Sequence, residues 1–333
     1  LEMLFLGPPT VGSEILATEG ISQKNVFAGK LRRWADWQNI LDIFKLPLGL
    51  IQSLWHLFFF MPHVVFSKGG YGSVPTVFGA WLYRIPIIIH ESDSIPGLAN
   101  RINSHFSRRI AISFSSANQF FPTEKTALTG NPVRPTLLNG DPTKITSLFG
   151  LSNLKPLLLV LGGSQGAQAI NNLIIESLPL LLPRCEIIHQ CGQANFDAIK
   201  QSLENKIPLG YSLQPFLDEA SLATALAAAK IVISRAGAGS IAEIAALGKP
   251  SILIPLPNSA ADHQLYNASE YAKTGAALII DQMNLTPHLF QSQVLSLLDK
   301  PETLIKMGHE SRKFNPPDAT LKIVQEILNL AKL

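Results

Sequence analysis

Three glycine-rich turns carry the residues whose types and spacing could bind a phosphorylated ligand. The first follows the apolar run Leu157–Leu161 and consists of Gly162, Gly163, Ser164, Gln165 and Gly166. Glycines after a strand let the backbone approach a ligand, and the free amides at the start of the next helix attract phosphate. The turn indicates a diphosphate site, although a simple tight turn between strand and helix would use the same residues.

A second turn follows the apolar run Ile231–Ser234 and leads into a predicted helix. The turn comprises Arg235, Ala236, Gly237, Ala238 and Gly239, and the predicted helix opens with Ser240, Ile241, Ala242 and Glu243. The acid Glu243 could bind ribose hydroxyls. Ser240 and Glu243 also have the spacing of a capping box, and on local sequence alone a helix cap is the better interpretation.

The third turn contains Gly69, Gly70 and Tyr71, which suit an acceptor bearing phosphate or sugar hydroxyls. A crowded turn onto a following helix is an equally good interpretation. Glu91 and Asp93 follow the apolar residues 85–89 and are candidates for a catalytic base or a binding group, although acidic turns are more often only solvated.

Arg134 lies at the end of a Gly-Asn-Pro-Val-Arg turn. Its forked donors match the oxygens of a diphosphate, whereas an ordinary surface arginine is the commoner case.

Short, continuously apolar runs alternate with helical segments along the whole chain, which predicts parallel sheets covered by helices on both faces. The fold class is therefore α/β of the doubly wound kind. A length of 333 residues favours two domains. The polar residues 139–155 suggest a hinge, which gives domains at 1–146 and 147–316. Residues 317–333 form a last helix that is expected to pack back on the first domain.

Composition excludes several classes. A formal charge of +3 is too small to predict nucleic-acid binding. Cys185 and Cys191 match no zinc or redox spacing, and the chain has no Asp-x-Asp motif, so we expect no metal or other cofactor. Residues 46–61 are apolar but too few to span a membrane.

The motifs in this order resemble glycosyltransferase family 28, and within it the bacterial transferases that make lipid II from lipid I. The resemblance runs nearly end to end. Besides the glycine turns, it rests on His90-Glu91, on Gly97-Leu98-Ala99-Asn100, on the turn that ends in Arg134, and on Asp262-His263-Gln264.

The resemblance implies the GT-B fold, in which two doubly wound, Rossmann-like domains face a cleft. The second domain would hold UDP-N-acetylglucosamine, and lipid I, the undecaprenyl-linked acceptor, would approach the first. Matching positions imply that Ser164 and Arg134 bind the diphosphate, Leu217 meets the uracil, Ala238 to Glu243 line the nucleotide with Glu243 on the ribose, and Gln264 contacts the sugar. The reaction would be an inverting transfer without a metal.

The sequence departs from the family in two ways. The family's Gly-Gly-Thr-Gly-Gly-His loop, whose histidine is the favoured base, does not occur in these 333 residues. Poor transfer or none by this chain alone is therefore expected, with Glu91 and Asp93 as candidate bases. Asp93 stands where the family typically has Asn. The alternatives are an inactive UDP-sugar-binding or scaffold protein, or another GT-B enzyme such as a UDP-N-acetylglucosamine epimerase.

Residues 44–61 are apolar around most of a predicted helix and lie near Lys30, Arg32 and Arg33. This pattern predicts peripheral docking on an anionic membrane surface, at the cytoplasmic face of the cell membrane. An ordinary buried core helix is the alternative.

Overall fold

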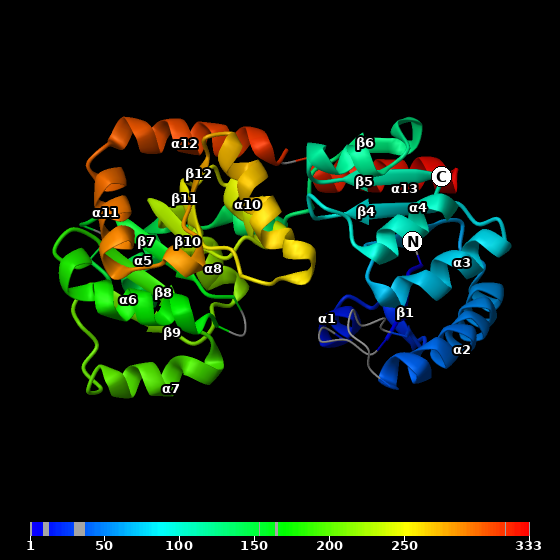
Figure 1. Ribbon diagram of the computed structural model, residues 1–333, viewed down its shortest axis with the longest axis horizontal. Coiled ribbons are helices and arrows are strands. Elements are labelled where there is room, and N and C mark those ends of the chain that lie inside the picture. The colour runs from blue at the N-terminus through cyan, green and yellow to red at the C-terminus, as the bar shows by residue number, and fades with distance from the viewer. Residues whose placement is uncertain are drawn as a thin grey trace. The chain divides into compact units, whose positions relative to one another are not determined.

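The computed structural model describes residues 2–8, 13–29, 37–152, 154–163, 166–316 and 318–332. The chain forms two compact units (Figure 1). Unit 1 comprises Leu1–Thr129 and Leu321–Leu333, and unit 2 comprises Gly130–Thr320. Both are α/β units with parallel sheets, which confirms the predicted fold class.

The units divide after Thr129, whereas the sequence suggested a boundary after residue 146. The intervening residues belong to unit 2 because they pack on helix α8 (Glu219–Ala228). Leu137 and Ile145 are fully buried there. At Gly140 the contact is so close that a Cβ atom would lie 2.0 Å from the Ala223 carbonyl oxygen. The polar composition of this segment therefore suggested a hinge, whereas its few apolar side chains are buried in unit 2.

Unit 2 contains six parallel strands in the order β12-β11-β10-β7-β8-β9. Their bounds are β7 Leu157–Leu161, β8 Glu186–Gln190, β9 Tyr211–Gln214, β10 Ile231–Ser234, β11 Ser251–Leu253 and β12 Ala277–Ile279. The chain starts at the centre with β7, builds outward to β9, and then returns to place β10 on the other side of β7. The strands are almost wholly buried, as their continuous apolarity predicted.

Helices cover both faces of this sheet (Figure 1). Besides α8 they are α5 Ile145–Phe149, α6 Gln168–Leu181, α7 Gln193–Ser202, α9 Ala238–Ala246, α10 His263–Lys273, α11 Pro287–Leu298 and α12 Pro301–Phe314.

Unit 1 contains a four-stranded parallel sheet in the order β3-β4-β5-β6 and a separate parallel pair, β1-β2. The strands are β1 Leu4–Gly7, β2 Ser22–Asn25, β3 Val65–Ser67, β4 Ile87–Glu91, β5 Arg109–Ile112 and β6 Thr126–Leu128. The helices are α1 Ser13–Thr18, α2 Trp37–Phe60, α3 Val74–Leu82, α4 Leu98–Phe106 and, at the carboxyl end, α13 Ala319–Ala331.

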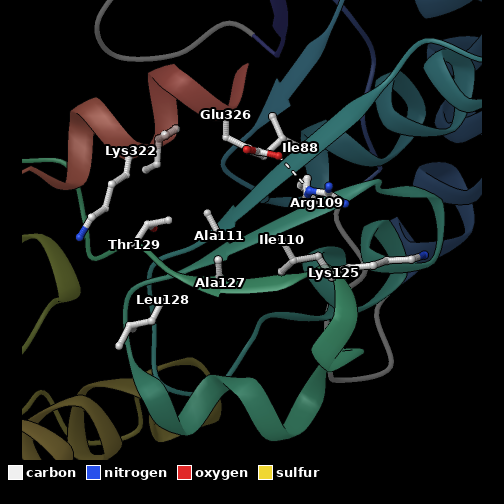
Figure 2. Close-up of a pocket in the computed structure, with 11 residues that line it drawn as sticks. Ile88, Arg109, Ile110, Ala111, Lys125, Ala127, Leu128, Thr129, Lys322 and Glu326 are labelled. Atoms are coloured by element: carbon white, nitrogen blue, oxygen red, sulfur yellow. Dashed lines mark hydrogen bonds and ion pairs between the residues drawn. The ribbon is translucent and has the colours of Figure 1, made fainter. Parts of the chain in front are cut away.

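Helix α13 packs on the sheet of unit 1. Ile323 is 4% exposed, and Arg109 Nε lies 2.9 Å from Glu326 Oε1. A cavity of about 240 Å³ lies between this helix and strands β4 to β6. Figure 2 shows the side chains that line it. The ammonium groups of Lys125 and Lys322 point to opposite sides of the cavity, so these two cations do not converge on one ligand position.

Candidate functional site

The sheet order of unit 2 marks the position of a ligand site. In open parallel sheets, ligands bind outside the carboxyl ends of the strands, at the point where the strand order reverses. Here the reversal lies between the neighbours β7 and β10, whose last residues, Leu161 and Ser234, are paired in register. Both glycine turns of the second domain therefore begin side by side at this point.

The first turn requires glycine at two places. Gly163 has φ 83° and Gly166 has φ 75°, and the Gly166 amide donates to the Gly163 carbonyl oxygen at 3.0 Å. A Cβ atom on Gly166 would lie 2.2 Å from the Cys191 carbonyl oxygen. The end of strand β8 thus lies directly against this turn. The candidate residues Ser164 and Gln165 are outside the described residues.

Gln190, the last residue of β8, connects the turn to the segment that follows β9. Its Nε2 atom donates to the Gly163 carbonyl oxygen, and its Oε1 atom accepts from the Leu217 amide, each at 3.3 Å. The Gln190 carbonyl oxygen also accepts from the Gly162 amide at 3.2 Å. We did not identify Gln190 from the sequence, and its place at the carboxyl end of a buried strand is the signal that could have shown it.

Helix α9 begins at Ala238, and its N-cap is Gly237, which makes no side-chain cap bond. Ser240 is therefore already inside the first turn, and the capping-box interpretation of Ser240 and Glu243 is wrong. The Glu243 Oε1 atom instead pairs with Arg134 Nη2 at 3.0 Å.

Of the candidate α9 residues, the structure leaves Gly239, Ser240 and Glu243 at least partly exposed, whereas Ala238, Ile241 and Ala242 are buried. The buried three can offer a ligand only backbone groups. Arg134 is half-exposed, and its second terminal nitrogen lies 4.0 Å from Glu219 Oε2.

Gln264, near the start of α10, closes the loop that follows β11. Its Oε1 atom accepts from the Leu256 amide at 3.0 Å. Arg235 holds the start of the same loop by donating to the Ile254 carbonyl oxygen at 3.0 Å. No described contact joins Gln264 to Arg134 or to the first glycine turn.

A buried network of hydrogen bonds supports the turn through the backbone at Cys191. His189 Nδ1 lies 2.8 Å from the Tyr211 hydroxyl, and its Nε2 lies 3.0 Å from Asn171 Oδ1. Asn171 in turn donates to the Cys191 carbonyl oxygen at 3.0 Å. Burial lowers the pKa of His189 to about 3, so the imidazole is neutral. Its single N–H proton therefore serves only one of these two hydrogen bonds, and the other ring nitrogen accepts.

In unit 1, Gly69 and Gly70 both have positive φ, at 84° and 79°. A Cβ atom on Gly69 would lie 2.6 Å from Asn100 Nδ2. That nitrogen donates to Glu91 Oε2 at 2.9 Å. The neighbouring Tyr71 is 43% exposed. The third glycine turn is therefore packed against a buried polar pair and leaves its aromatic residue accessible.

The two candidate bases have different environments. Glu91 is 4% exposed, and its Oε1 atom accepts from the Asp93 amide at 2.9 Å. Burial raises the pKa of Glu91 in spite of these hydrogen bonds. Burial lowers the pKa of the neighbouring Lys68, although the carboxylates of Glu91 and Asp93 act in the opposite direction. Asp93 is partly exposed. Glu91 thus has its oxygens committed to the turn, and Asp93 is the accessible carboxylate.

Within the described ranges, no group of three or more His, Cys, Asp or Glu side chains could hold a metal ion. In the same part of the chain, no helix combines the length and apolarity needed to cross a membrane.

Comparison with known proteins gives consistent matches along the chain. The glycosyltransferase family 28 N-terminal domain matches residues 4–112, and the C-terminal domain of that family matches residues 157–323. A UDP-N-acetylglucosamine–N-acetylmuramyl-(pentapeptide) pyrophosphoryl-undecaprenol N-acetylglucosamine transferase of Clostridium tetani is 36% identical over 98% of this chain and 90% of its own length. The transferase of the same name from Legionella pneumophila is 38% identical over 94% of this chain and 85% of its own length.

Among solved structures, MurG of Acinetobacter baumannii superposes with a TM-score of 0.75 at 28% identity, over 98% of this chain and 91% of that one. The UDP-GlcNAc 2-epimerase of Neisseria meningitidis bound to UDP-GlcNAc superposes with a TM-score of 0.69 at 14% identity, over 98% of this chain and 91% of that one. The second likeness is one of fold alone.

Proposed function

Since the chain belongs to glycosyltransferase family 28, we propose that it transfers N-acetylglucosamine from UDP-N-acetylglucosamine to lipid I and so makes lipid II for peptidoglycan. Lipid I is the N-acetylmuramyl-pentapeptide pyrophosphoryl-undecaprenol acceptor that the relatives' name describes. The observation that supports this most strongly is 36% identity to a transferase of that name over 98% of the chain.

The donor belongs in unit 2, at the strand reversal. The diphosphate lies on the turn that contains Gly162, Gly163 and Gly166, next to the amino-terminal end of helix α6, which attracts phosphate. Arg134 contributes as well, because its ion pair with Glu243 leaves most of the five guanidinium donors for phosphate oxygens. Glu243 binds the ribose.

Two further residues complete the donor site. Leu217 meets the uracil, on the other side of Gln190 from the turn. Gln264 contacts the sugar, from the loop that follows β11.

The reaction is a single displacement with inversion. An acceptor hydroxyl oxygen bonds to the anomeric carbon, the bond from that carbon to the diphosphate breaks, and UDP leaves with the electron pair. The hydroxyl proton passes to a carboxylate, for which we propose Asp93. The backbone amides at the start of helix α6 and the guanidinium group of Arg134 stabilise the charge that develops on UDP, and this needs no cofactor.

Calorimetry with UDP tests the donor site. Glu243→Ala and Arg134→Ala should each weaken binding by about 1.5–3 kcal/mol, because each removes a charge-assisted contact, and Ser164→Ala should weaken it in the same direction. Arg184→Ala is the matched control, since Arg184 is another half-exposed arginine of unit 2 and pairs with Asp299. Unchanged UDP affinity in both the Glu243 and the Arg134 variants would show that the site is elsewhere.

The base assignment has its own test. Asp93→Asn should lower kcat by on the order of a hundredfold and leave UDP affinity unchanged, because the amide cannot accept the proton. Glu91→Gln should mainly lower the thermal stability of unit 1, because it disturbs the bonds to Asn100 and to the Asp93 amide. Normal kcat in Asp93→Asn would exclude Asp93 as the base.

We also propose that helix α2 docks on an anionic membrane surface, at the cytoplasmic face. The helix buries Leu57 against α3, but the side chains of Leu48, Ile51, Trp55, Phe58, Phe59 and Met61 are 52–68% exposed. The ring centroids of Trp55 and Phe59 lie 4.6 Å apart. An ordinary core helix would not expose this many large apolar groups. The basic residues Lys30, Arg32 and Arg33 are outside the described residues.

Vesicle co-sedimentation measures this docking. Replacing Trp55 and Phe59 with Ser, and the three cations with Gln, should abolish binding to anionic vesicles and leave UDP affinity intact, since each cation near the surface adds about 1 kcal/mol. Leu209→Ser with Met283→Ser is the control, because these residues of unit 2 are 95% and 87% exposed. If the α2 variant sediments like the wild type, the proposal is wrong.

A further inference from the structure

We propose that Gln190 is the positioning residue that couples the phosphate turn to the base-binding segment, so that one buried amide sets two parts of the donor site at once. This inference rests on the proposed function. It concerns a residue that has no direct place in the chemistry.

The side chain of Gln190 is 6% exposed and has two separate arms. The Nε2 atom donates to the carbonyl oxygen of Gly163, and the Oε1 atom accepts from the amide of Leu217, both at 3.3 Å. The first arm ends in the diphosphate turn and the second in the segment proposed to meet uracil. A glutamine is suited to this position because it offers a donor and an acceptor on one rigid plane.

The surroundings make the donor arm important. Gly163 has φ 83°, and its carbonyl oxygen also accepts from the Gly166 amide at 3.0 Å. Orienting this carbonyl therefore orients the turn. The backbone of β8 also fixes the turn, because Gly166 lies against the carbonyl oxygen of Cys191, the residue that directly follows Gln190. The glycine turn is thus held at Gly166 by the backbone of β8, and the side chain of Gln190 links its other end, at Gly163, to the segment after β9.

Two substitutions distinguish the loss of one hydrogen bond of Gln190 from the loss of both. Gln190→Glu keeps an oxygen that accepts from the Leu217 amide but replaces the donor to Gly163 with a second oxygen, which repels the carbonyl. Gln190→Met has a similar volume and removes both arms. Gln214→Glu is the matched control, because Gln214 is the register partner of Gln190 on β9 and donates instead to Ser212 Oγ at 3.0 Å.

The probes are UDP and uridine, which differ in the diphosphate. We expect Gln190→Glu to raise the Kd for UDP about tenfold or more and the Kd for uridine less than about threefold, since one buried hydrogen bond to the turn is lost. Gln190→Met should raise both Kd values, and Gln214→Glu should change neither.

A pH series provides a readout that a merely structural role would not move. Protonation of the carboxyl in Gln190→Glu restores a donor to the Gly163 carbonyl oxygen, and burial favours the protonated form. The ratio of the variant's Kd for UDP to that of the wild type should therefore fall toward one as the pH is lowered from about 8 to about 5.

Equal losses of UDP and uridine affinity in Gln190→Glu, no loss of either, or a ratio independent of pH would each overturn the coupling role. Wild-type protein that binds neither uridine nor UDP would contradict the proposed function itself, and the inference with it.

Discussion

At the scale of single residues, Gly166 is the glycine of the donor turn at which an added Cβ atom would collide most severely. Gly166→Ala places a Cβ atom 2.2 Å from the Cys191 carbonyl oxygen at a φ of 75°. We expect a loss of about 3 kcal/mol in the free energy of unfolding, from the left-handed conformation and the collision together. UDP binding should be weakened as well.

Gly275→Ala is the control for Gly166→Ala, because Gly275 has φ 84° but no atom within 4 Å of the added Cβ. It should cost only the conformational part, about 1–2 kcal/mol. Urea unfolding of both variants measures the difference, and equal losses would mean that the contact with β8 is not tight.

His189 gives a prediction about pH. Burial lowers its pKa to about 3, from 6.5 in the unfolded chain. Below pH 6.5 the unfolded state therefore binds a proton that the folded state does not, and this contribution to stability is lost as the pH falls, by about 1.4 kcal/mol per unit. His189→Gln lacks this titration. The stability advantage of the wild type over His189→Gln should shrink by about 2 kcal/mol between pH 7 and pH 5, measured by urea unfolding. A constant difference would mean that the imidazole takes up its proton over the same pH range in the folded and unfolded states.

Sequence could identify these residues only in part. The glycines predicted the turn, because glycines that directly follow a strand are typical of a tight turn. The capping box of Ser240 and Glu243 was wrongly predicted from local spacing, because the partner of Glu243, Arg134, lies 109 residues away. The contacts of Gln190 were missed for the same reason, since Gly163 and Leu217 each lie 27 residues away from it.

At the scale of elements, helix α13 completes unit 1 mainly through apolar packing. Ile323→Ala should lower the stability of unit 1 by about 2–5 kcal/mol, because the side chain is 4% exposed and leaves a cavity. Glu326→Gln should cost less than about 1 kcal/mol, since its ion pair with Arg109 is partly solvated.

Leu321→Ala is the control on the same helix, because Leu321 is 70% exposed and should contribute within about 0.5 kcal/mol. Thermal unfolding of the three variants ranks their losses of stability. A larger loss in Glu326→Gln than in Ile323→Ala would contradict the packing account.

The elements themselves were largely predictable. The apolar runs at Leu157–Leu161 and Ile231–Ser234 coincide with β7 and β10. Strand order was not predictable residue by residue, because it depends on pairings such as β7 with β10, which lie more than 70 residues apart. The ligand position follows from that order.

At the scale of the whole molecule, each unit brings its own part of the proposed reaction. Unit 2 contains the strand reversal with two glycine turns, and unit 1 contains the third glycine turn with Asp93. The division after Thr129 assigns Arg134 to the same unit as Glu243, which agrees with their ion pair.

The central claim is the transfer of N-acetylglucosamine, and the most direct measurement follows the sugar itself. The protein is incubated with lipid I and with UDP-N-acetylglucosamine labelled in the sugar, and the label is located by chromatography. We predict one labelled N-acetylglucosamine per acceptor in lipid II and one UDP released with it, with less of both from Arg134→Ala. Label that stays in the nucleotide sugar as an epimer, or that never enters the lipid although UDP binds, would contradict the account.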